Sequence, residues 1–295
     1  MIEVLSPGPL ATVQDLGRLG YSDLGVSRSG AADRGALRLA NRLVGNDESA
    51  AGIEITFGGL ALRLADAATV AFTGARCELS GHRGGWNAAL SCPAGSVLTV
   101  GAPATGLRSY LAIRGGLAVA PVLGSRATDT LSGLGPAVLA AGRRLRIGPT
   151  AAGEPSDFSG AAGSGPPAGT PTLRLAAGPR ADWFTPESLS RLFGSPWQVR
   201  PDSNRIGVRL AGNALGLRSD AERAAAELPS EPTLPGAVQV PPDGQPIVLG
   251  PDAPVTGGYP VIAVLPAAEL DLLAQLRPGA ELRFAAVRAP SVHPG

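Results

Sequence analysis

The sequence contains no lysine, and all 25 of its basic residues are arginines. It therefore has no amine for Schiff-base chemistry, no lysine to carry covalent biotin, and no lysine for a phosphate-binding P-loop. Histidine is nearly as scarce, because only His82 and His293 are present. A nucleophilic site that relies on a histidine would have to use His82, and we do not expect one.

Cysteine is limited to Cys77 and Cys92. Two cysteines with one nearby histidine do not supply the four ligands of a structural zinc site, so we predict no metal site. The two cysteines are compatible with a disulfide, but two buried thiols in a reducing compartment are favoured. The first residues, MIEVLSPG, lack the basic and apolar regions of a signal peptide, which predicts a cytoplasmic protein.

Long apolar runs and an excess of charge are also missing. No stretch of about 18 apolar residues occurs, so no membrane span is expected. The 25 basic and 24 acidic residues give a net charge of +1, and without a basic cluster nucleic acid is not an expected partner. Glycine and proline are abundant instead, with 41 and 28 residues, which predicts a turn-rich, mainly β protein.

Short alternating segments bounded by glycine or proline predict strands in both halves of the chain. In the first half they begin at Ile2 and cover 53–57, 60–64, 68–74, 96–100, 108–116 and 143–148. In the second half they cover 173–178, 197–200, 206–212, 236–241, 246–250 and 281–287. This spacing predicts an antiparallel barrel or sandwich in each half and does not fit a Rossmann fold.

Three helices are predicted. Asp33 caps a helix with apolar residues at helical spacing, which Gly45 ends. Thr185 precedes a second helix that has proline at its first position. A third runs over 266–276.

Residues 150–171, TAAGEPSDFSGAAGSGPPAGTP, form the one segment that differs in composition from the rest. So few branched apolar residues cannot bury enough surface to offset the entropy of ordering them. The sequence therefore predicts a linker over 150–171 between an N-terminal domain of residues 1–149 and a C-terminal domain of residues 172–295.

Three turn-rich segments concentrate polar residues of the kind found at functional sites. The segment 12–37 holds Asp15, Arg18, Ser29 and Asp33, although caps and turns also explain such residues. In 200–212, Arg205 offers a planar fork of donors to a carboxylate or phosphate, or serves as a solvated turn arginine. The segment 228–260 is the densest, and its polar and turn residues are Glu231, Gln239, Asp252, Thr256, Gly257, Gly258 and Tyr259.

Long stretches of the chain match a known pattern in order. They are TVQDLGRLG, SGAADRGALRLANRLVGN, IEITFGG, RSYLAIRGG, GSRATD, SNRIGVRL, GAVQVPPDGQPIVLGPDAPVTGGYP and AELDLLAQLRPG. In these residues the sequence resembles allophanate hydrolase subunit 2, a family also known as the biotin-dependent carboxyltransferases or as the C component of 5-oxoprolinase. The resemblance implies a cyclophilin-like β-barrel architecture, which agrees with the strand pattern and predicts two such antiparallel barrel domains.

The resemblance also implies partners and a reaction. It implies a partner of the allophanate hydrolase subunit 1 type, which is the B-like component of 5-oxoprolinase, and a third, lactam-utilisation protein, which is the A-like component. Together these would form an ATP-dependent 5-oxoprolinase that opens the pyroglutamate lactam to glutamate. Two alternatives stay open: the carboxyltransferase component of a biotin-dependent carboxylase acting on urea or another amide, and a regulatory protein that antagonises an inhibitor of a kinase.

For the oxoprolinase reaction the polar residues take definite roles. Glu231 or Asp252 would act as the base or orient water, and Tyr259 would help to polarise the lactam carbonyl. The expected substrate-binding residues are Asp15, Arg18, Ser29, Arg205, Gln239, Thr256, Gly257 and Gly258. Arg205 or Arg18 would hold the substrate carboxylate. We expect the groups near 205, 231 and 252–259 to converge in one cavity close to the partner interface.

Overall fold

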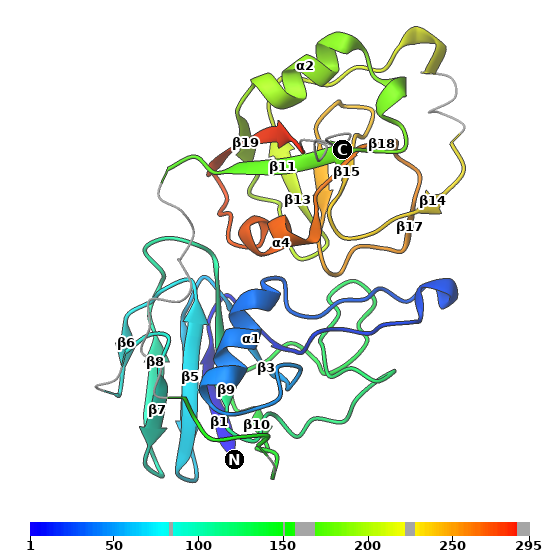
Figure 1. Cartoon of the computed structure of the whole chain (residues 1–295). Coiled ribbons are helices and arrows are strands. Elements are labelled where there is room, and N and C mark those ends of the chain that lie inside the picture. The colour runs from blue at the N-terminus through cyan, green and yellow to red at the C-terminus, as the bar shows by residue number, and fades with distance from the viewer. Residues whose placement is uncertain (83–84, 150, 157–168, 222–227, 288–295) are drawn as a thin grey trace, which may run out of the picture.

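The computed structural model describes residues 1–82, 85–149, 151–156, 169–221 and 228–287. Figure 1 shows two lobes, with the strands of the first half in the lower lobe and those of the second half in the upper lobe. Strands dominate both lobes and helices are few and short, as the sequence predicts. Within these described residues, no helix is long and apolar enough to cross a membrane.

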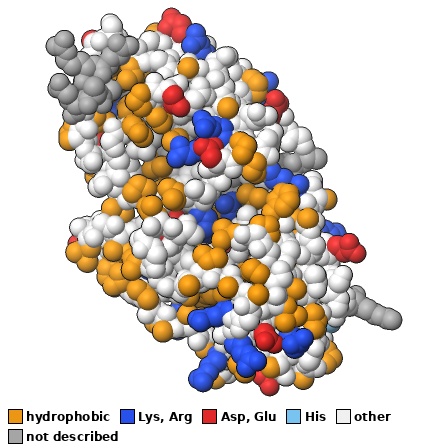
Figure 2. Space-filling model, turned by 180° about the vertical axis from the view of Figure 1, so that it is seen from behind, with side chains coloured by type: hydrophobic (Ala, Val, Ile, Leu, Met, Phe, Trp, Pro, Cys, Tyr) orange, Lys and Arg blue, Asp and Glu red, His pale blue; other side chains and the backbone are white. Residues whose placement is uncertain are grey.

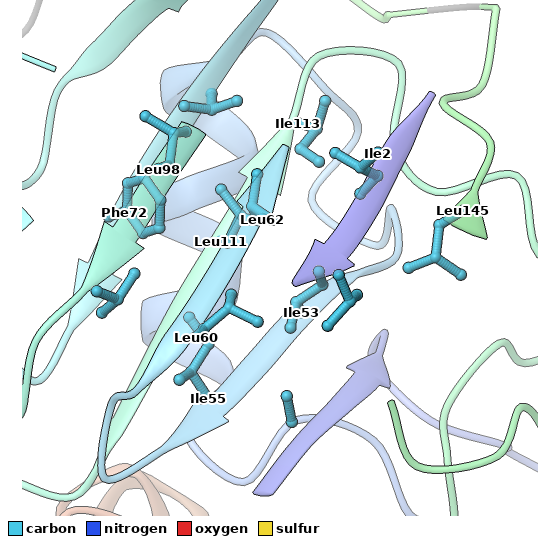
Figure 3. Packing of buried hydrophobic residues seen from close by; sticks show 14 of the residues in the cluster. Ile2, Ile53, Ile55, Leu60, Leu62, Phe72, Leu98, Leu111, Ile113 and Leu145 are labelled. Atoms are coloured by element: carbon cyan, nitrogen blue, oxygen red, sulfur yellow. The ribbon is translucent and has the colours of Figure 1, made fainter. Parts of the chain in front are cut away.

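The first half folds into two five-stranded antiparallel sheets. The first sheet has the order β10-β1-β4-β8-β6, with bounds Arg144–Leu145, Ile2–Pro7, Leu60–Leu64, Val97–Val100 and Leu79–Ser80. The second has the order β2-β3-β9-β5-β7, with bounds Leu10–Gln14, Gly52–Thr56, Arg108–Ile113, Ala68–Gly74 and Ala89–Cys92. Apolar side chains of both sheets meet in one core between them (Figure 3).

Helix α1 (Arg34–Leu43) begins where the sequence predicts, because the Asp33 side chain accepts a hydrogen bond of 2.8 Å from the Ala36 backbone N–H. Its apolar side packs on Ala71 and Ala112 of the second sheet. Strand β9 is consequently buried on both faces, one against the sheet core and the other beneath α1. The helix thereby fixes its own N-terminal residues at the end of the lobe that faces the second half (Figure 1).

The second half forms a closed seven-stranded barrel in the order β11-β18-β15-β16-β13-β12-β19. The bounds are Thr172–Ala177, Val261–Val264, Ala237–Gln239, Ile247–Leu249, Gly207–Ala211, Trp197–Val199 and Glu281–Ala286. Helices α2 (Pro186–Gly194) and α4 (Ala267–Leu273) pack against the barrel, and Thr185 caps α2 as predicted. A short pair outside the barrel joins β14 (Glu231–Pro232) to β17 (Thr256–Gly257).

The prediction of two antiparallel barrels needs correction in two respects. The first half is a pair of open sheets, since β1 and β2 turn at Gly8 into different layers. In the second half the barrel closes through a parallel pair, β11 with β19, while the other barrel pairs are antiparallel. Alternation along a strand shows which face is buried, but it does not say which strand edges will pair.

Two further predictions concern the linker and the cysteines. Residue 150 and residues 157–168 of the predicted linker lie outside the described residues. The first described residues of this linker contact the first half. The Gly153 N–H donates to the Gly45 carbonyl over 2.8 Å, and the Ser156 N–H donates to the Leu43 carbonyl over 2.9 Å. Cys77 and Cys92 are buried free thiols, in agreement with the favoured interpretation.

Candidate functional site

The predicted site residues separate into two clusters and a pair of loop anchors. We call the first cluster the interdomain network, made of Ser29, Glu54, Thr130, Arg205 and Asp252. The second is the Glu231 cluster, made of Arg180, Glu231, Gln239, Gly257 and Tyr259. The anchors are Asp15 and Arg18. The expected single cavity is therefore not what the structure shows: Arg205 and Tyr259 line different cavities.

Arg205 is the centre of the interdomain network and is 2% exposed. Its Nε and Nη2 donate to the two Asp252 carboxylate oxygens over 2.8 and 2.9 Å. Its Nη1 donates to Glu54 Oε1 over 2.5 Å, and Nη2 also donates to the Gly30 carbonyl over 2.6 Å. The guanidinium from the second half is thus bound by a carboxylate and a carbonyl of the first half, and it has no free edge for a substrate carboxylate.

Asp252 is fully buried and its oxygens are equally occupied. Besides Arg205, they accept hydrogen bonds from Ser29 Oγ over 2.7 Å, from Thr130 N over 2.9 Å and from Thr130 Oγ1 over 2.7 Å. Burial would raise the pKa of Asp252, but Arg205 and these hydrogen bonds lower it below its ordinary value. A buried carboxylate with this many donors does not fit the predicted role of base; the geometry gives it a role in joining the two halves.

Glu54 is the partner that the sequence analysis did not single out. Burial raises its pKa, but Arg205 and Arg108 reverse this effect and leave the pKa below its usual range. Its Oε2 accepts from the Ala32 N–H over 2.9 Å and from the Tyr110 hydroxyl over 2.8 Å. The available signal was a carboxylate inside the apolar strand IEITF, where a buried charge requires a cation from elsewhere in the fold.

A second buried contact between the halves involves Gln275, just after α4. Its Oε1 accepts from the Leu107 and Arg108 N–H groups over 3.0 Å each, and its Nε2 donates to Asp33 Oδ2 over 2.6 Å. Burial raises the pKa of Asp33 to about 6, and the nearby Asp271 adds to the effect. Asp33 therefore serves both as the helix cap predicted from sequence and as part of the contact between the halves.

Asp15 and Arg18 tie two loops of the first half together. Asp15 accepts from the Gly17 N–H over 2.8 Å, from Ser125 Oγ over 2.6 Å and from the Arg126 N–H over 2.5 Å. Arg18 donates to the Ala127 carbonyl over 2.5 Å and to the Val122 carbonyl over 3.2 Å. Both side chains are buried, so this geometry favours loop anchoring over the predicted contact with substrate.

The Glu231 cluster is more open. Glu231 pairs with Gly257 across the β14–β17 ladder, and its carboxylate forms an ion pair with Arg180, whose guanidinium lies 4.6 Å from the centre of the Trp183 ring. Gln239, on β15, donates to the Tyr259 carbonyl over 3.4 Å. A Cβ at Gly257 would lie 2.5 Å from Gln239 Nε2, so glycine is what allows this approach.

A groove of about 480 Å³ adjoins this cluster. Gly258 and Tyr259 line it together with Leu217, Leu228 and Pro241, and Tyr259 keeps 44% of its surface exposed. Thr256 and Gly258 are also exposed. Five of the predicted residues, Gln239, Thr256, Gly257, Gly258 and Tyr259, thus lie on or beside one accessible surface with Glu231. Across the part of the chain that the structure describes, no group of three or more His, Cys, Asp or Glu residues could hold a metal ion.

Comparison with known proteins gives this two-lobed β architecture a class. The family model described as "Carboxyltransferase domain, subdomain A and B" matches residues 24–286. The chain belongs to this family.

The chain is 41% identical to the 5-oxoprolinase C subunit of Escherichia coli, over 96% of this chain and 90% of that protein. It is 33% identical to the 5-oxoprolinase C subunit of Haemophilus influenzae, over 97% and 91%. The crystal structure of the K. lactis urea amidolyase superposes with a TM-score of 0.87 at 32% identity, covering 97% of this chain. This chain corresponds to only 19% of that longer chain.

Proposed function

We propose that this chain is the C subunit of an ATP-dependent 5-oxoprolinase, which opens the lactam ring of 5-oxoproline to glutamate. The observation that carries the proposal is the 41% identity along nearly the whole of both proteins to a relative named for that role. In the reaction the carbon–nitrogen bond of the lactam breaks, one water gives its oxygen to the new carboxylate, and both protons of that water go to the nitrogen, which leaves as an ammonium group. A second water is consumed when the coupled ATP is hydrolysed to ADP and phosphate.

We place the reacting groups at the Glu231 cluster. Glu231 is partly exposed, and a carboxylate in that position can orient water or accept its proton. Tyr259, Thr256 and the Gly257 and Gly258 backbone amides lie on the accessible side, where donors can stabilise a developing oxyanion. Arg205 and Asp252 are assigned to joining the two halves, because all their charged edges are already bound.

We assign the nucleotide chemistry to partner subunits of the B and A types. The chain has no lysine, so a P-loop of the usual kind is excluded by its sequence. An exposed reactive surface that lacks its own nucleotide loop is consistent with a site completed by a partner. We also propose a cytoplasmic location, on the basis of the two free thiols, Cys77 and Cys92.

The test is ATP-dependent conversion of 5-oxoproline to glutamate by the chain co-purified with its B-like and A-like partners. Glu231→Gln and Tyr259→Phe should each lower this rate about 10²-fold. The matched control is Glu281→Gln, which changes an exposed carboxylate at the start of β19 and should retain the rate. Full turnover in both site variants would remove the Glu231 cluster from the mechanism.

The superposition on the urea amidolyase favours a second candidate, the carboxyltransferase component of a biotin-dependent carboxylase. Biotin would then arrive on another protein, since this chain has no lysine to carry it. Turnover that requires bicarbonate and a biotinylated carrier would support this candidate. Turnover with ATP and 5-oxoproline in the absence of a biotinylated carrier would support the oxoprolinase.

A further inference from the structure

A cavity of about 230 Å³ lies between the two halves, apart from the groove at Tyr259. Its charged lining consists of Arg34, Arg38 and Arg108 from the first half and Asp271 from α4 of the second. Asn204 of the second half adds an amide, and the remaining wall is mostly apolar. Figure 2 shows basic side chains in the seam between the lobes, and all basic side chains of this lysine-free chain are arginines.

The charges around this cavity do not balance. Asp271 is engaged with the start of α1, where it accepts from the Arg34 and Gly35 N–H groups over 2.8 and 3.1 Å. Arg108 donates to the Ala274 carbonyl, and its Nε lies 3.5 Å from Glu54 Oε1. Arg38 Nε lies 3.6 Å from Glu48 Oε2. The Arg34 guanidinium, in contrast, makes no hydrogen bond or close ion pair with the residues that the structure describes; Asp271 bonds the Arg34 backbone N–H and attracts the guanidinium only through space.

A fourth arginine, Arg28, lies close to Arg34 and Arg38 and adds to the excess of positive charge. Burial and the nearby Arg28 lower the pKa of Arg34 to about 10; Asp271 opposes this shift and Arg38 adds to it. Burial and Arg38 likewise lower the pKa of Arg28, and its Nε is a buried donor without a described partner. Like charges held together in a partly buried place destabilise the fold unless an anion joins them.

We propose that this cavity binds a small oxyanion, a carboxylate or a single phosphate group, through Arg34 and Arg38. A guanidinium binds either group through paired, charge-assisted hydrogen bonds. The volume is below the roughly 300–1,000 Å³ of pockets for drug-sized ligands, so a small acid or one phosphate fits better than a whole nucleotide. This site is separate from the Glu231 cluster, and the inference does not depend on the proposed reaction.

An anion in this place would contact both halves of the molecule. It would face Arg34 and Arg38 on one side and Asn204 on the other. A ligand that binds only the folded arrangement raises its stability in proportion to the logarithm of ligand concentration over Kd. The inference is therefore open to a measurement that needs no enzymatic activity.

The experiment is thermal unfolding of the full chain titrated with 5-oxoproline, with glutamate and with inorganic phosphate, each against chloride at equal ionic strength. We expect at least one of these anions to raise the Tm in a saturable manner. Arg34→Gln and Arg38→Gln should each weaken the apparent affinity about tenfold or more. Without anion, Arg34→Gln should be at least as stable as the parent chain, because it removes one of the mutually repelling charges.

Arg63→Gln, which changes an exposed arginine paired with Glu3 on the first sheet, is the matched control and should keep the full response. A response to 5-oxoproline or glutamate identifies a carboxylate as the ligand group, and a response to phosphate alone identifies a phosphate. The inference is overturned if no anion acts beyond chloride, or if both arginine variants respond like the parent. Should Arg34→Gln not fold, the half-exposed Arg38 carries the same test.

Discussion

Two arginine–carboxylate clusters in this molecule use the same chemistry in opposite surroundings. Arg205, Glu54 and Asp252 have side chains that are 0–1% exposed, whereas the Arg180 and Glu231 side chains keep 32% and 24% of their surface in solvent. A buried ion pair is costly to break, because the remaining charge has neither water nor a counter-ion. An exposed pair can open and close at little cost. Burial thus makes the first cluster a fixed joint and leaves the second available to a ligand.

Removal of Arg205 tests the difference between the two clusters most directly. Arg205→Leu leaves the buried Asp252 carboxylate without its cation and Glu54 with Arg108 alone, and we expect the free energy of unfolding to fall by about 3–5 kcal/mol in urea titrations. This loss of unfolding free energy should become smaller toward acidic pH, because protonation neutralises Glu54 and Asp252. Arg200→Gln, in the exposed turn next to it, is the matched control and should leave the midpoint unchanged. Equal effects of the two substitutions would contradict the assignment of Arg205 as a buried joint.

The pH dependence of stability offers the next largest effect. The pKa of Asp33 is about 6 in the fold against an ordinary value of 3.8, so the folded state holds its proton more tightly than the unfolded state. The contribution of protonated Asp33 to the free energy of unfolding is therefore complete below about pH 4 and is lost as the pH rises through 6.

The difference in unfolding free energy between the parent chain and Asp33→Asn isolates this group. We expect it to fall by about 2–3 kcal/mol between pH 4 and pH 7. Asparagine keeps an oxygen for the cap of α1, so the helix start is preserved. A difference that is constant over this range would show that Asp33 is not perturbed by burial.

The smallest expected effect is at the open cluster. Arg180→Gln removes an ion pair that solvent already screens, and the urea midpoint should stay close to that of the parent chain. Binding of the partner proteins, measured by co-purification, should also persist. A large loss of stability would place the Glu231 cluster in the same structural class as Arg205.

Local features were the most predictable part of this protein. Asp33 and Thr185 cap their helices as expected, and Gln239 is buried on the strand predicted at 236–241. Such features depend on neighbouring residues, whose spacing is written in the chain. The strand at Val261–Val264 was not predicted, and the strand pattern left a barrel and a two-sheet sandwich both open for the first half, because strand pairing is decided by distant partners.

The order of the residues is enough to predict a turn-rich β protein with capped helices and to exclude the chemistry that requires a lysine. The sequence also held the residues that form both clusters. The packing of the two halves is what encloses Arg205 and Asp252 with Glu54 and leaves Glu231 and Tyr259 open to solvent. The reason is physical: a side chain carries its charge in any fold, but what that charge does depends on which distant groups surround it and how much water they leave.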